Sequence, residues 1–171
     1  MNSEIRKMLE EVREGSLSVD DALLQLKTEP FDDIGYAKVD LHRRTRQGFP
    51  EVIYGAGKTP EQMIGILQSL KKGGQDKILI TRLPAEAAAE ISASEPIIYF
   101  DKARIGFLGE LPPADGIGRI VVATGGTSDI PVAEEAAVTA ELLGNDVIRL
   151  YDVGVAGLHR LLAHKAEKIG R

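Results

Sequence analysis

Hydrophobic and polar positions follow two periods along this chain, one typical of helices and one typical of strands. In Ser3–Glu14 apolar residues recur every three or four positions between charged ones, which predicts an amphipathic helix that Gly15 ends. Ser18, with Asp21 three residues later, predicts an N-cap for a second helix over Val19–Leu26. We interpret this helix pair as a structural appendage or an oligomer contact.

From position 31 to position 109, short apolar runs alternate with helical patterns. Phe31–Gly35 has the composition of a loop, and strands are expected at Lys38–Arg43, Glu51–Tyr54, Lys77–Thr81, Pro96–Phe100 and Ala103–Leu108. One helix is expected to begin at Pro60 behind a Thr59 cap, and an alanine-rich helix is expected over Leu83–Ser92. This order predicts a small α/β unit with a mainly parallel sheet.

The stretch from 120 to 162 organises the remaining chain. Ile120–Ala123 is an apolar run typical of a strand covered on both faces. A polar glycine-containing loop follows, then a helix with Pro131 in its first turn, and then a second predicted strand, Asp146–Leu150. Leu111–Gly118, with its prolines and glycines, predicts a linker. We therefore expect three regions, over residues 1–30, 31–115 and 116–171.

The loop after the first of these strands carries the candidate chemistry. Gly125 and Gly126 let the backbone turn and approach a ligand closely, and the hydroxyls of Thr127 and Ser128 add further polar groups. At the carboxyl end of a strand and the start of a helix, such groups can hold a phosphate. Asp129 either caps the helix or acts as an acid/base group beside the ligand, and a plain Ser/Asp cap remains an alternative for the whole loop.

A second candidate segment follows the next strand. Gly154 and Gly157 again permit close backbone approach. Asp152, His159 and Arg160 offer a proton acceptor, a titrating imidazole and a phosphate clamp. A single histidine on a helix is more often packed or solvated than catalytic. His159 is therefore interpreted either as such a side chain or as a group with a direct role.

Basic residues are concentrated in one place. Arg43, Arg44 and Arg46 lie in one short segment, and Lys58 follows two glycines before a helix. A Walker A loop needs four residues between its glycines and this chain has one there, so we reject a nucleoside triphosphatase. These cations either reach a phosphate or are ordinary solvated charges.

Composition narrows the class of protein. The chain has 171 residues, a net charge of −5 and an isoelectric point near 5.3, which argues against a nucleic-acid binder. It contains no cysteine, which excludes disulfides and thiolate sites within these residues. No run approaches the roughly 20 apolar residues of a membrane helix. We expect no membrane partner and a cytoplasmic location.

Three motifs together carry a family resemblance. The segments ATGGTSDIPVAEEA and DVGVAGLHRLL, preceded by VDLHRRTRQGFPEVIYGAGKTPEQ, resemble the LarB family, which has a PurE-like domain related to aminoimidazole ribonucleotide carboxylase. The resemblance implies the first half of a flavodoxin-like (PurE-like) three-layer parallel sheet. It also implies nickel-pincer cofactor biosynthesis. Such enzymes carboxylate the pyridinium ring of nicotinic acid adenine dinucleotide and hydrolyse its phosphoanhydride, giving a biscarboxylic mononucleotide and AMP.

The resemblance also implies roles for individual residues. Catalytic roles fall to Ser128, Asp129 and Asp152. Substrate contacts fall to Gly125, Gly126, Thr127, Ser128, Gly154, Ala156, Gly157, His159, Arg160, Arg43, Arg46 and Lys58. Carbon dioxide or bicarbonate would be the co-substrate, the nucleotide would be the partner, and a homo-oligomer is expected. No metal ligand is assigned, although Mg²⁺ could approach Asp129 or Asp152 through water.

The cysteine content departs from that of the family. In LarB-type enzymes a cysteine in the continuing half of the domain attacks the pyridinium ring, and this chain has none. We expect an N-terminal portion that binds a nucleotide without completing the covalent chemistry. Two alternatives remain: a PurE-type aminoimidazole ribonucleotide carboxylase or mutase, and a non-catalytic nucleotide-binding module.

Overall fold

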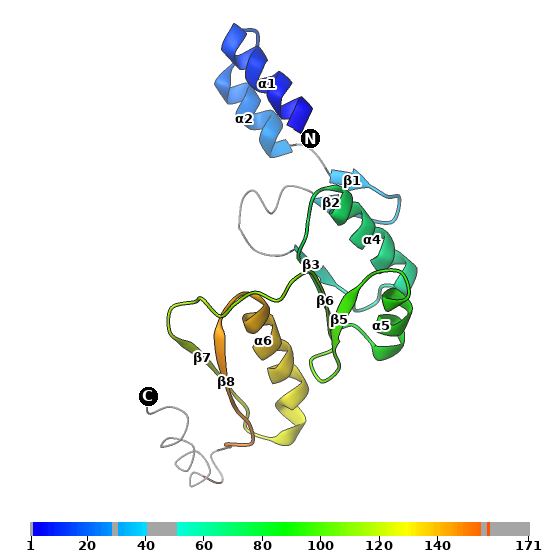
Figure 1. The fold of residues 1–171 in the computed structure, drawn as a ribbon, viewed down its shortest axis with the longest axis vertical. Coiled ribbons are helices and arrows are strands. Elements are labelled where there is room, and N and C mark those ends of the chain that lie inside the picture. Colours follow the sequence, from blue (N-terminus) through cyan, green and yellow to red (C-terminus); the bar gives the residue numbers. More distant parts are fainter. Residues whose placement is uncertain (1, 29–30, 41–50, 155–156, 158–171) are drawn as a thin grey trace.

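The computed structural model describes residues 2–28, 31–40, 51–154 and 157. Helices α1 (Asn2–Glu14) and α2 (Val19–Thr28) lie side by side at the N-terminal end (Figure 1). The predicted cap of α2 is confirmed, because the Asp21 amide donates to the Ser18 hydroxyl at 3.0 Å and that hydroxyl donates to the Asp21 carboxylate at 2.6 Å. Gly15 ends α1 with a φ of 77°, in the left-handed region that favours glycine.

A short hairpin follows where a loop was expected. Strands β1 (Phe31–Asp33) and β2 (Lys38–Asp40) pair antiparallel, so the loop assigned to Phe31–Gly35 is wrong. The Asp33 carboxylate accepts the Gly35 amide at 2.9 Å, and Gly35 has a φ of 88°. These two features build a tight local turn that composition alone does not distinguish from a loop. The rest of the strand expected over Lys38–Arg43 lies outside the described residues.

The next sheet, called the first sheet below because the hairpin of β1 and β2 stands apart from it, has four strands in the order β3-β4-β6-β5. Their bounds are β3 (Glu51–Tyr54), β4 (Ile78–Thr81), β5 (Ile97–Phe100) and β6 (Ile105–Leu108). Strands β3 and β4 are parallel, but β6 runs antiparallel to both β4 and β5. The expectation of a mainly parallel sheet is therefore wrong. The short turn between β5 and β6 is the reason, because a parallel pair needs a crossover of a dozen or more residues.

Helices cover both faces of this sheet (Figure 1), which confirms the α/β class. Helices α4 (Pro60–Lys72) and α5 (Ala85–Ser92) pack on the face to which Ile78 and Ile80 of β4 point. Thr59 caps α4 as predicted, and its hydroxyl accepts the Gln62 amide at 3.3 Å. The residues fully buried in this core are Met63, Leu67, Leu70, Ile78, Ile80, Leu83 and Ile91.

Helix α6 (Ile130–Leu142) covers the opposite face. Its Val138 and Leu142 pack with Leu79, Ile105 and Phe107 of the sheet. Leu79 points opposite to its neighbours in β4, as the two-residue period of a strand requires. Because α6 follows the predicted linker and still closes this core, the regions over 31–115 and 116–171 share buried side chains.

A second sheet lies on the other side of α6. Strands β7 (Arg119–Ala123) and β8 (Asp146–Leu150) are parallel, and α6 is the crossover between them. Ile120 and Val121 are 40% and 45% exposed, so the described residues do not cover β7 on both faces as expected. The segment 111–118 contains no helix or strand. Among the described residues no helix is long and apolar enough to span a bilayer.

Candidate functional site

The two predicted loops meet at the carboxyl edge of β7 and β8. The ladder of the two strands continues past their ends, because the Thr124 amide donates to the Leu150 carbonyl at 3.0 Å and the Val153 amide to the Thr124 carbonyl at 2.9 Å. The Gly154 amide then donates to the Gly125 carbonyl at 3.1 Å. The structure therefore brings Gly125 and Gly126 next to Asp152 and Gly154. In open α/β sheets this edge is where ligands bind.

Thr124 connects the two loops, and the sequence assigned it no role of its own although it begins the predicted loop. It is buried, and its hydroxyl accepts the backbone amide of Asp152 at 3.0 Å. Asp152 has a φ of 57°, a left-handed conformation that is uncommon for residues other than glycine but is tolerated by aspartate. A polar residue directly after an apolar strand is the only signal in the sequence that pointed to Thr124.

Packing excludes a side chain at one glycine of this edge but not at two others. A Cβ on Gly154 would lie 2.5 Å from the carbonyl oxygen of Gly125, so chain packing excludes a side chain there. On Gly125 or Gly126 the nearest atoms to a Cβ are 3.8 and 3.9 Å away, and neither residue has a positive φ. Neither backbone conformation nor packing within the described chain requires glycine at these two positions. Their missing side chains leave the loop backbone open to a ligand.

Asp129 has a defined partner within the loop. The loop's polar residues form the short 3₁₀ helix η1 (Thr127–Asp129), and the Asp129 carboxylate accepts the Gly126 amide at 3.1 Å. No side chain caps α6 itself. Thr127 and Ser128 are exposed, and no hydrogen bond joins their hydroxyls to another described residue. The loop therefore presents two hydroxyls and a carboxylate beside open backbone.

The structure does not bring all the predicted site residues together. Gly157 is buried, and its amide donates to the Gly154 carbonyl at 3.0 Å. The predicted contacts at Arg43, Arg46, Ala156, His159 and Arg160 lie outside the described residues. Lys58 is away from the loop: it lies beside β3 and its ammonium donates to the Tyr54 carbonyl at 2.8 Å.

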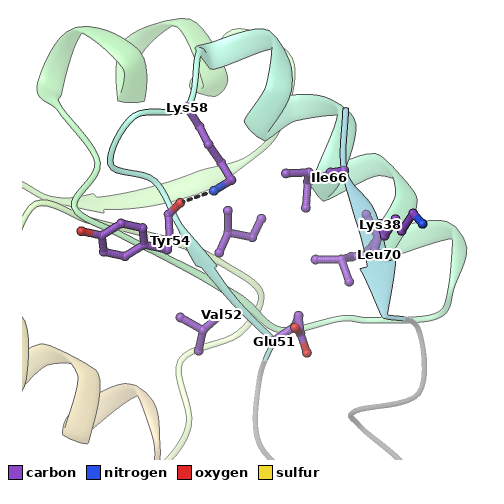
Figure 2. Close-up of a pocket in the computed structure, with 10 residues that line it drawn as sticks. Lys38, Glu51, Val52, Tyr54, Lys58, Ile66 and Leu70 are labelled. Carbon is purple, nitrogen blue, oxygen red and sulfur yellow. Dashed lines mark hydrogen bonds between the residues drawn. The ribbon is translucent and has the colours of Figure 1, made fainter. Parts of the chain in front are cut away.

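Lys58 lines a pocket of about 250 Å³ between β2, β3 and α4 (Figure 2). The floor is apolar and includes Ile53, Ile66 and Leu70, and Lys38 and Glu51 add charges. The complete lining is Ala37, Lys38, Val39, Glu51, Val52, Ile53, Tyr54, Lys58, Ile66 and Leu70. This pocket belongs to the first sheet and is separate from the loop at β7 and β8.

A charged network that sequence reasoning missed fixes β8 against α6. The Arg149 guanidinium donates to Glu141 at 2.8 Å and to Glu134 at 3.3 Å. The hydrogen bond to Glu141 raises the pKa of Arg149 further above its ordinary value. Burial raises the pKa of the Tyr151 phenol, which follows β8 and is outside this network. Arg149 comes from β8 and the two glutamates from α6, so the network holds the helix and strand that flank the loop. Glu134 and Glu141 precede Arg149 by 15 and 8 residues, and no local motif links them.

Metal ligands are not gathered in the described part of the chain. No group of three or more histidine, cysteine, aspartate or glutamate residues is placed there to hold an ion. The roles predicted for Asp129 and Asp152 towards Mg²⁺ stay predictions.

Two comparisons with known proteins bear on this site. Residues 31–110 match the sequence profile of the LarB/PurE-like N-terminal domain. The chain is also similar to an uncharacterized protein of Methanocaldococcus jannaschii, with 36% identity over 168 residues. That alignment covers 94% of this chain and 66% of the relative, so the chain spans just under two thirds of the relative's length. The profile ends before the loop at β7, whereas the alignment with the relative is long enough to include it.

Proposed function

We propose, on the premise that residues 31–110 are a LarB/PurE-like N-terminal domain related to carboxylase-type proteins, that this chain serves nickel-pincer cofactor biosynthesis. The proposed reaction adds carbon dioxide or bicarbonate to the pyridinium ring of nicotinic acid adenine dinucleotide. Water then splits the phosphoanhydride, giving the biscarboxylic mononucleotide and AMP. The single observation that supports this site is the joining of the loop at Gly125–Asp129 to Asp152–Gly154 at one sheet edge.

Within this proposal the loop holds the anionic part of the substrate. The amides near Gly125 and the hydroxyls of Thr127 and Ser128 donate to a phosphate or carboxylate. Asp129 already occupies the Gly126 amide, so an incoming anion meets a carboxylate of like charge. Asp129 then either moves aside or takes up a proton from the substrate, and Asp152 is the second candidate for that proton transfer.

The chain has no cysteine, so a thiolate attack on the ring cannot come from these residues. We therefore propose that the 171-residue chain binds the nucleotide without completing the covalent step. The test is incubation with nicotinic acid adenine dinucleotide and bicarbonate, followed by mass spectrometry of the products. Formation of the dicarboxylated mononucleotide by this chain alone would contradict the proposal.

A variant of Asp129 tests how its negative charge affects nucleotide binding. Asp129→Asn keeps an oxygen that can accept the Gly126 amide but removes the negative charge. We expect tighter binding of the dinucleotide because repulsion between like charges is lost. Titration calorimetry measures the change, and Glu86→Gln, which removes an exposed carboxylate on α5, serves as the control.

Two other functions are separated by the choice of ligand. A PurE-type carboxylase would bind aminoimidazole ribonucleotide in preference to the dinucleotide. A non-catalytic module would bind a nucleotide through the same loop with no turnover in any longer form of the protein. The LarB/PurE-like domain upstream of the loop favours the LarB-type function over both.

A further inference from the structure

Arg82 lies directly after β4, at the carboxyl end of the first sheet, and it has an unusual backbone. Its φ is 54°, in the left-handed region that residues with a side chain seldom adopt. Such conformations persist where surrounding structure holds them, and they concentrate at functional positions. The arginine side chain is 46% exposed.

The guanidinium of Arg82 is anchored along one edge. Its Nε donates to Oε1 of Glu135 at 2.9 Å and lies 2.6 Å from Oε2. The hydrogen bond to Glu135 raises the pKa of Arg82, so the group stays charged. Within the part of the chain that the structure describes, no other hydrogen bond joins this guanidinium to a residue, so no described group occupies its two terminal nitrogens. A guanidinium held in this way presents two parallel N–H donors, the arrangement that binds a phosphate through two oxygens.

Tyr54 provides an aromatic surface beside this cation. It is the last residue of β3 and pairs with Thr81, the residue before Arg82. Its ring points away from Ile66 and Leu70 of α4 (Figure 2) and is 57% exposed. An exposed ring next to an anchored guanidinium suits a nucleoside phosphate. The base can stack on the ring while the terminal guanidinium nitrogens donate to the phosphate.

This position is connected to the candidate loop through α6. Glu135 lies in the second turn of that helix, about 7.5 Å along its axis from the start at Ile130. Helix α6 begins where the loop ends. Glu135 therefore links the end of β4 to the helix that directly follows the loop.

We propose that Arg82 and Tyr54 form the subsite for the adenylate half of the dinucleotide, with the loop at Gly125–Asp129 taking the other half. This inference rests on the proposed function for the identity of the ligand. Glu135 is a positioning residue, because it orients the guanidinium without contacting the nucleotide. The assignment gives the N-terminal domain a direct part in substrate binding.

The experiment titrates the complete chain with AMP, adenosine and inorganic phosphate as separate probes. Calorimetry gives the affinities, and the Nε–H resonance of Arg82 in a ¹⁵N spectrum reports the guanidinium itself. Arg82→Lys keeps the positive charge but removes the pair of terminal guanidinium donors. We expect it to weaken the binding of AMP about tenfold or more and to leave the binding of adenosine unchanged. Tyr54→Ala should weaken the binding of both AMP and adenosine by about fivefold or more. Tyr54→Phe keeps the ring and should retain both affinities.

Arg104 provides a matched control. It is an exposed arginine with a φ of 52° in the turn before β6. Arg104→Lys should leave AMP affinity unchanged. Equal losses in the two lysine variants, or wild-type chain that binds no AMP, would overturn the subsite. Thermal unfolding of each variant shows that a loss of binding is not a loss of fold.

The failure of this inference is distinguishable from failure of the proposed function. If the dinucleotide binds through the loop and Arg82→Lys has no effect on it, only the subsite is wrong. If AMP binds through Arg82 but nicotinic acid adenine dinucleotide binds no better than AMP, the subsite stands and the proposed substrate is wrong.

Discussion

The four-stranded sheet and the two-stranded sheet of β7 and β8 are built from similar apolar strands but stand in different surroundings. In the four-stranded sheet Ile78, Leu79 and Ile80 are completely buried, with helices on both faces. In the sheet of β7 and β8, Ile120 and Val121 are exposed. Helix α6 packs on this sheet as well as on the first one. The first sheet holds most of the buried core, and the second carries the loops with candidate chemistry. The difference shows that an apolar run predicts a strand well but does not predict what covers it.

The largest expected contrast is in stability. Phe107→Ala removes a fully buried ring packed between the first sheet and α6, and we expect a loss of about 3–5 kcal/mol. Val121→Ala, on the exposed second sheet, should cost less than about 1 kcal/mol. Denaturant unfolding of both variants measures the two values. Equal losses would mean that the second sheet is covered in solution, for instance in a homo-oligomer.

The next contrast separates glycines needed for packing from glycines open to a ligand. Gly154→Ala places a methyl against the Gly125 carbonyl and should cost about 1–3 kcal/mol because the loops must move apart. Gly126→Ala meets nothing closer than 3.9 Å, so its stability should change by less than about 1 kcal/mol. We expect it to weaken nucleotide binding instead. Thermal unfolding and calorimetry of the two alanine variants give both quantities, and reversed roles would contradict the distinction.

Thr124 tests the connection between the loops with a smaller change. Thr124→Val leaves the Asp152 amide without its partner hydroxyl, and we expect a loss of about 1–2 kcal/mol. Thr124→Ser keeps the hydroxyl and should retain most of the stability. Similar unfolding curves for the valine variant and the wild type would show that water satisfies the Asp152 amide.

Local patterns predicted much of this fold. The Ser18 and Thr59 caps, the helix at α4 and the strands β7 and β8 follow from capping residues and apolar periodicity within a few positions. These patterns did not predict the direction of the strands in the first sheet. That direction depends on the short turn between β5 and β6, not on the residues of the strands themselves. The packing of α6 on the first sheet did not follow either, since Val138 and Leu142 give no sign of which sheet they meet.

The site was predictable in its position but not in its contacts. The loop at Gly125–Asp129 follows from the order of strand, glycines, hydroxyls and helix. Residues that act through long-range contacts, such as Arg82 with Glu135 and Arg149 with Glu141, belong to no local motif. Only the fold brings these charges together. The roles of the loop residues in catalysis and substrate binding stay predictions.

The central claim is that the joined loops at the carboxyl edge of β7 and β8 bind a nucleotide. Titrating the ¹⁵N-labelled chain with nicotinic acid adenine dinucleotide and following each backbone amide tests it most directly. We expect saturable shifts at Gly125, Gly126 and Thr127, while the amide of Leu79 in the first sheet stays unchanged. Saturable shifts confined to the pocket beside Lys58, with none in the loop, would contradict the claim.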